Sequence, residues 1–169
     1  MRSINRLYFF ILMFLLLELA FTPTHALSIN IPQNDRDNFS QEFLGKWKMQ
    51  SVVTSSRCPY VIVGSTTESE LEITPEINSN KNILLNAIWH GGNWTDCTGN
   101  IKFLNKKEAI TERVTELKSD DENIWKAILI DHLKLDEDKN KMQSESIVIQ
   151  YKNGQAVGEY KTYSILTKY

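Results

Sequence analysis

Residues that could perform acid–base chemistry are few in this sequence, and their spacing does not bring them together. Asp131 directly precedes His132, a pair that could act as a general base oriented by a carboxylate. Neighbouring residues of a strand point to opposite faces of a sheet, so these two side chains meet only if the strand bulges. Glu112 and Glu116 could form paired carboxylates, but an outward polar face of a predicted strand explains them better. His90 precedes two glycines, which favours a loop residue at the rim of the fold over a metal ligand.

Longer motifs for catalysis, phosphate binding and metal binding are absent from the sequence. It has no Gly-x-Ser-x-Gly, no phosphate-binding loop and no spacing typical of metal ligands. Acidic and basic residues are interspersed and the formal net charge is −2, which argues against a nucleic-acid partner. These features favour a binding protein with no cofactor and no bound metal, and leave a divergent enzyme as the weakest alternative.

The first 26 residues have the three zones of a cleavable secretory signal. Arg2 and Arg6 precede an apolar run over residues 7–17, and a polar stretch ending at residues 24–26 follows. The small residues of that stretch suit a signal peptidase. A retained membrane anchor is the alternative, but a span needs about 20 apolar residues, and Glu18 interrupts this one. We therefore predict a secreted or periplasmic protein with no stable membrane insertion after the signal is removed.

Cys58 and Cys97 are the two cysteines of the chain. Two cysteines so far apart, with few histidines, do not form a zinc set. An exported protein enters an oxidising compartment, where paired cysteines are usually bridged. A bridge would close a loop of about 40 residues and stabilise the fold by about 4 kcal/mol in the chain-entropy model. The sequence thus predicts a Cys58–Cys97 disulfide.

Alternating apolar and polar residues follow one another from residue 45 to the end of the chain. A period of two is typical of half-buried strands, and no stretch shows a helical period with caps. Trp47, Trp89 and Trp125 fall on the faces that we predict to point inward. The predicted strands cover residues 45–53, 68–74, 83–89, 100–104, 109–117, 125–135 and 146–151, with an eighth strand after residue 154.

The last two strands are joined by Asn153-Gly154, a typical type I′ hairpin turn. A direct register across this turn pairs Ile147 with Tyr160. It predicts that Ile147, Ile149, Tyr160 and Lys168 all point to the same, inner side.

Eight strands joined by short turns, each with one apolar face, predict an all-β fold. An open sheet of this size would leave an apolar side and two edges uncovered, and closing it into a barrel hides all three. We therefore expect an up-and-down antiparallel barrel over residues 43–169, preceded by an arm at residues 27–42. A two-sheet sandwich is the alternative.

Residues 43–48, with Asn38-Phe39 upstream, resemble the opening of the lipocalins and of the wider calycin superfamily. In those families a Gly-x-Trp, here Gly45-Lys46-Trp47, begins the first strand: the glycine permits a tight entry and the tryptophan closes the floor of the barrel. The resemblance covers about ten residues, and the family's Thr-Asp-Tyr turn and terminal helix are missing. It also implies that a basic residue near the last strand packs over the tryptophan, and Lys168 is the candidate.

The resemblance implies that the barrel binds a small apolar molecule. Small eight-stranded barrels are either filled by side chains or hold one small ligand, so a protein-binding module with a solid barrel, such as a periplasmic protease inhibitor, is the alternative. In that case a loop or the arm contacts the protein partner. Asn38 and Asn93 begin glycosylation sequons that matter only in a eukaryotic host. The expected ligand-binding residues are Trp47, Met49, Trp89, Phe103 and Tyr160.

Overall fold

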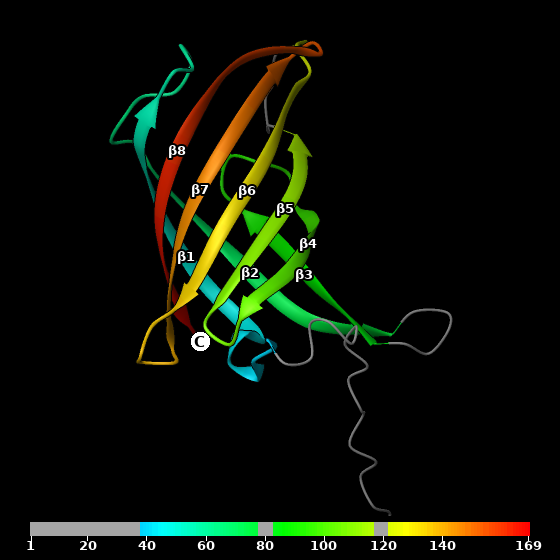
Figure 1. The fold of residues 1–169 in the computed structure, drawn as a ribbon. Helices are drawn as coiled ribbons and strands as arrows, with labels where there is room; N and C mark the ends of the chain where they lie inside the picture. Colours follow the sequence, from blue (N-terminus) through cyan, green and yellow to red (C-terminus); the bar gives the residue numbers. More distant parts are fainter. Residues whose placement is uncertain (1–37, 78–82, 117–121) are drawn as a thin grey trace, which may run out of the picture.

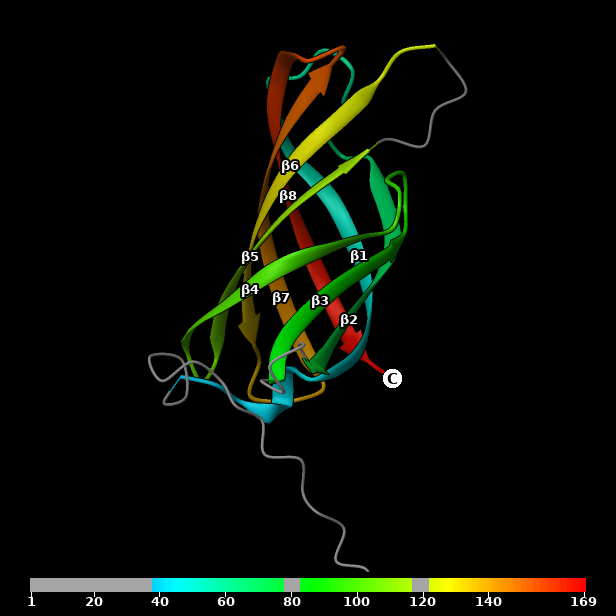
Figure 2. The same ribbon diagram turned by 90° about the vertical axis from the view of Figure 1, so that its right-hand side faces the viewer.

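The computed structural model describes residues 38–77, 83–116 and 122–169, whose strands form one closed antiparallel barrel. Each strand pairs with the next along the chain, and β1 pairs with β8 to close the sheet (Figures 1 and 2). The predicted all-β, eight-stranded up-and-down barrel is therefore confirmed. Its elements are η1 (Gln41–Phe43), β1 (Gly45–Ser56), β2 (Thr66–Ile77), β3 (Ile83–Gly91), β4 (Cys97–Asn105), β5 (Glu108–Glu116), β6 (Trp125–Leu135), β7 (Lys141–Lys152) and β8 (Gln155–Lys168).

The predicted signal sequence, residues 1–26, and most of the predicted arm lie outside the described residues. The described end of the arm forms the 3-10 turn η1, which Ser40 caps by accepting a hydrogen bond from the backbone N–H of Glu42 at 3.3 Å. In the described part of the chain, no helix has the length and apolar character needed to span a bilayer.

One end of the barrel, the lower end in Figure 1, is filled with large side chains, and we call it the floor. Phe103 contacts the rings of both Phe39 and Phe43 edge to face, with centroids 5.3 and 5.2 Å apart. Trp47 is fully buried beside them. The other buried members of the floor are Met49, Leu71, Ile73, Ala87, Trp89, Ala109, Leu133, Leu135, Met142 and Leu166.

The Gly-x-Trp segment has the geometry that the resemblance implies. The indole of Trp47 donates to the carbonyl of Phe43 at 2.9 Å, which ties the first strand to η1. The ammonium of Lys168 lies 5.1 Å from the Trp47 ring centroid and donates to the carbonyl of Glu42 at 2.9 Å. Gly45 has φ +117°, and a Cβ there would lie 3.0 Å from Lys168 Cε, so glycine permits this close packing.

The predicted register of the last hairpin is wrong beyond its first pair. Tyr151 faces Ala156 as predicted, but the register then shifts at a β-bulge, and Tyr160 faces Val148 instead of Ile147. One extra residue on β8 reverses the relation between the faces of the two strands. Val148 is consequently buried, whereas Ile147 points outward and is 42% exposed.

The predicted disulfide is not present in the structure, where both cysteines are free thiols. Cys58 is buried among apolar residues at the upper end of the barrel, and its thiol donates to Gln150 Oε1 at 3.1 Å. Cys97 begins β4 and packs against the floor cluster. The correction follows from the barrel itself, because the two cysteines belong to different parts of its interior.

Replacement of Trp47 by alanine tests the role of the floor. Trp47→Ala should lower the free energy of unfolding by about 3–5 kcal/mol, the usual loss for a large buried aromatic side chain, as measured by urea denaturation. Trp94→Ala is the matched control, because Trp94 is only half-buried and should cost less. Equal losses for the two variants would show that the floor does not depend on Trp47.

Candidate functional site

The upper half of the barrel contains a cavity of about 420 Å³ that is open at the end opposite the floor. This end, which we call the mouth, carries the β1–β2 and β3–β4 loops and the β7–β8 turn (Figure 1). The interior is thus solid at one end and hollow at the other. Ligand sites in proteins commonly measure about 300–1,000 Å³, so the cavity is large enough for one small molecule.

Polar side chains form a layer between the floor and the apolar wall of the mouth. On β1, Ser51 lies between floor residue Met49 and mouth residue Val53, and on β6 Asp131 separates Leu133 from Leu129 in the same way. This arrangement divides the core into two apolar clusters. The members of this polar layer are Ser51, Thr111, Arg113, Asp131, Ser144, Ser146 and Ser164.

An ion pair between Arg113 and Asp131 lies within the polar layer. Arg113 Nε is 3.4 Å from Asp131 Oδ2, and Thr111 donates to the same oxygen at 2.9 Å. The two charged side chains are only 6% and 4% exposed, so both charges are largely removed from water. The guanidinium also lies 4.3 Å from the Trp89 ring centroid, a favourable cation–π contact. Arg113 lines the cavity and therefore presents a positive group at its base.

The wall above the polar layer is mainly apolar. Val53, Leu129 and Val148 belong to the second core cluster and line the cavity. Trp125 and Tyr160 add two aromatic faces, each 8% exposed. An apolar molecule of suitable size would therefore contact carbon atoms on most sides.

The β1–β2 loop folds over one side of the mouth. The ring of Tyr60 packs edge to face on Trp125 with centroids 5.0 Å apart, and the ammonium of Lys152 lies 5.5 Å from the Tyr60 ring centroid. Gly158 on β8 permits the loop to come close, because a Cβ there would lie 2.7 Å from Cys58 Cα. The loop contributes Tyr60, Val61, Ile62 and Ser65 to the cavity lining.

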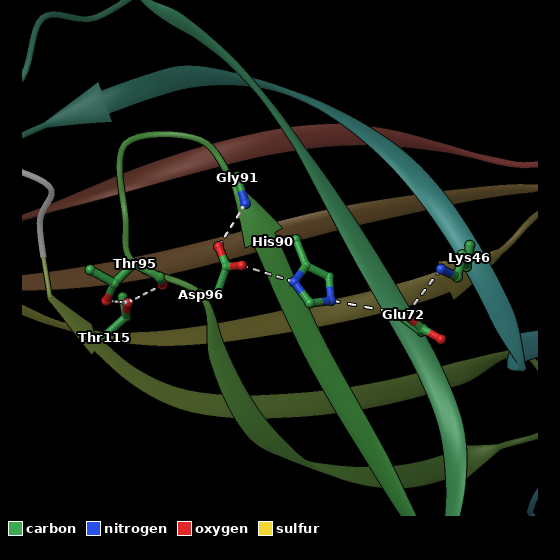
Figure 3. A network of polar contacts seen from close by, with 7 residues as sticks. All are labelled: Lys46, Glu72, His90, Gly91, Thr95, Asp96 and Thr115. Atoms are coloured by element: carbon green, nitrogen blue, oxygen red, sulfur yellow. Dashed lines mark hydrogen bonds and ion pairs between the residues drawn. The ribbon is translucent and has the colours of Figure 1, made fainter.

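The β3–β4 loop covers another side of the mouth and is held by a polar network on the outer wall (Figure 3). Asp96 accepts from the N–H of Gly91 and contacts His90 Nδ1, both at 3.1 Å. His90 Nε2 is in turn 3.9 Å from Glu72. At the end of the loop, Thr115 donates to the carbonyl of Thr95 at 2.8 Å. His90 is thus an outer-wall residue of β3 that fixes a loop, whereas a position in the loop was predicted.

Of the five expected ligand-binding residues, three line the cavity and two do not. Met49 and Trp89 lie at its base, and Tyr160 lies in its upper wall. Trp47 and Phe103 belong to the floor below the polar layer, because they lie near the ends of β1 and β4 that form the floor of the barrel.

The sequence analysis missed one charged residue of the cavity lining, Arg113, and considered its ion-pair partner Asp131 only as a neighbour of His132. The inward positions of β6, which alternate from Trp125 to Leu135, are apolar except at Asp131, the one charged residue with inward parity on that strand. That interruption was the available signal. As expected, Asp131 and His132 point to opposite faces: His132 is exposed and lies 3.8 Å from Glu108.

Comparison with known proteins finds a likeness to a solved structure. No protein-family model and no curated protein matches the chain. Among solved structures, the chain is similar to a protein of unknown function from the DUF3598 family of Nostoc punctiforme, with 14% identity and a TM-score of 0.40. The match covers 82% of this chain and 52% of the other, so this chain spans about half the length of that protein. The closed eight-stranded sheet itself is consistent with a calycin-like barrel.

Burial of the Tyr160 hydroxyl raises its pKa from 10.0 to about 12, although a hydrogen bond from Trp94 and the charge of Arg113 act in the opposite direction. The folded state therefore favours the neutral, protonated form of the hydroxyl over the phenolate. Because the unfolded chain releases this proton first, the stabilising contribution is complete below pH 10 and is lost as the pH rises toward 12.

Tyr160→Phe tests this linkage. The variant should show a shallower fall in unfolding free energy than the wild-type protein between about pH 10 and 12, as measured by urea denaturation at several alkaline pH values. An unchanged slope would show that the hydroxyl of Tyr160 is as well solvated in the folded chain as in the unfolded chain.

Proposed function

We propose that the protein is an exported, lipocalin-like carrier of one small amphipathic molecule. Its ligand has an apolar body and one anionic or hydrogen-bond-accepting end. The single observation that carries this proposal is the cavity of about 420 Å³, with an apolar wall and a buried guanidinium at its base. Export is supported by the three-zone N-terminal sequence, and the lipocalin likeness by the packing of Trp47 and Lys168.

The polar end of the ligand is inferred from the chemistry of Arg113. Within the described residues, its contacts with Asp131 are made through Nε, which leaves the two terminal NH₂ groups for an acceptor in the cavity. Tyr160 and Gln150 also line the cavity and provide further hydrogen-bonding groups. A charge-assisted hydrogen bond in a desolvated site contributes about 1.5–3 kcal/mol, enough to orient a ligand whose remaining contacts are apolar.

Binding of a protein through the mouth is the second candidate. The β1–β2 loop exposes three large apolar side chains, Tyr60, Ile62 and Val63, at 57%, 77% and 56%. Such residues could enter a groove of a partner such as a protease. The cavity favours the carrier, because a solid barrel packed at crystal-like density would have no such volume.

Uptake of paired fluorescent probes tests the proposal. Phenylnaphthylamine, which is neutral, and its sulfonated relative anilinonaphthalene sulfonate should both bind saturably at about one per chain. Thr162→Phe places a ring in the cavity and should weaken both probes by at least about tenfold, a loss of about 1.4 kcal/mol. Thr167→Phe is the matched control, since Thr167 is exposed on the same strand, and should leave binding unchanged.

A second variant tests the orienting charge. Removing one member of a buried ion pair leaves the other uncompensated, so Arg113→Gln and Asp131→Asn are combined. The double variant should bind the sulfonate about tenfold more weakly and the neutral probe with unchanged affinity. If the wild-type protein bound neither probe saturably, the carrier proposal would be overturned. If the double variant weakened both probes equally, the role of Arg113 would be overturned.

A further inference from the structure

A patch of large aliphatic side chains lies on the outer wall of the barrel, on the opposite face of the sheet from the cavity. The outward positions of β1 and β2 are mostly charged or amide residues, such as Lys48 and Glu70, as expected for the solvated face of a sheet. On β5, β6 and β7, aliphatic residues occupy neighbouring outward positions instead. Val114, Ile130 and Ile147 are 58%, 40% and 42% exposed. We call this set the aliphatic patch: Val114, Ile128, Ile130, Ile147 and Ile149.

Cross-strand pairing makes the patch continuous. Ile130 lies directly beside Ile147, and Ile128 lies beside Ile149. Val114 extends the second row onto β5, where it pairs with Ile128. Contiguous exposed apolar surface with a polar rim is typical of protein interaction sites.

The charges at the rim of the patch are arranged so that the patch complements itself. The central row reads Glu112, Ile130, Ile147, Lys161 from β5 to β8, with an acid at one end and a base at the other. A two-fold axis along the strands, between β6 and β7, would exchange the two ends of this row. Ile130 would then pack on the partner's Ile147, and Glu112 would meet the partner's Lys161.

One neighbouring row agrees with the same axis. His132 and Glu145 pair on β6 and β7, and the axis places His132 opposite the partner's Glu145. In the other row it places Val114 opposite the partner's Glu159, a carboxylate already paired with Arg57 at 3.5 Å. An axis perpendicular to the strands and through the central row would instead set Glu112 against the partner's Glu112, a contact between like charges.

The rim charges are also available for a partner. Other outer-wall charges pair within the chain, such as Lys126 with Glu116 at 3.4 Å. Among the described residues, the side chains of Glu112, Glu145 and Lys161 have no ion-pair partner. The rim carries both signs, which does not suit an anionic membrane surface, whose ligands are rich in Lys and Arg.

We propose that the aliphatic patch is the interface of a homodimer, in which β6 and β7 of two copies pack face to face about a two-fold axis along the strands. Two convex walls meet over a limited area, and interfaces below about 1,200 Å² are usually weak. The dimer should therefore dissociate at micromolar concentration. This inference does not depend on the proposed ligand, because the patch and the cavity lie on opposite faces of the sheet.

Sedimentation equilibrium of the wild-type chain and of charge-swapped variants tests the dimer. Glu112→Lys and Lys161→Glu should each weaken association at least about fivefold, because each introduces two like-charge contacts per dimer. The double variant restores both pairs and should return association to within about twofold of wild type. Lys102→Glu, an exposed substitution on β4, is the control and should have no effect.

Ile147→Lys should give a monomer at all concentrations, with the melting temperature confirming that the exposed substitution leaves the barrel folded. A wild-type protein that stays monomeric at high micromolar concentration would overturn the proposal. A dimer that survives Ile147→Lys would also overturn it, as would a double charge swap that associates no better than the single variants.

Discussion

The β1–β8 seam is the contact on which the rest of the barrel depends. At the floor end of the seam, Trp47 lies opposite Lys168. The Lys168 ammonium covers the indole and donates a hydrogen bond to the Glu42 carbonyl in η1. Higher up, Ser51 and Ser164 hydrogen-bond across the seam at 2.8 Å. Closing the sheet here removes both edges, and filling the floor with aromatic rings leaves the remaining interior volume at the mouth. The position of the cavity is thus a consequence of how the first and last strands meet.

The polar layer is costly to bury and gives the cavity its chemical character. Transfer of charged groups out of water is repaid only by close pairing and hydrogen bonds, which Thr111, Asp131 and Arg113 provide for one another. The pair sits where the solid floor ends and the open cavity begins. A barrel used only as a scaffold would be served as well by apolar residues at these positions. A ligand with a polar end would accept hydrogen bonds from the guanidinium at the base of an otherwise apolar site.

Much of the fold was predictable because a period of two marks each strand and places Trp47, Trp89 and Trp125 inside. Two features were not. The bulge before Gly158 lies where the start of the β1–β2 loop approaches β8, because a Cβ on Gly158 would lie 2.7 Å from Cys58 Cα. No local pattern encodes this long-range contact, and the bulge turns Ile147 outward. The floor and the mouth are different layers along the same inner face of the sheet. The alternation of inward and outward residues along a strand therefore could not distinguish Phe103, in the floor, from Tyr160, in the cavity wall.

The most direct test of the account is the location of a bound amphiphile. Crystals grown with a fatty acid brominated at its last carbon would reveal the bromine by anomalous scattering. The account predicts one bromine per chain between Val53, Trp125 and Val148, with the carboxylate within hydrogen-bonding distance of Arg113. A bromine below the polar layer beside Phe103, or an interior that holds only water at saturating fatty acid, would contradict it.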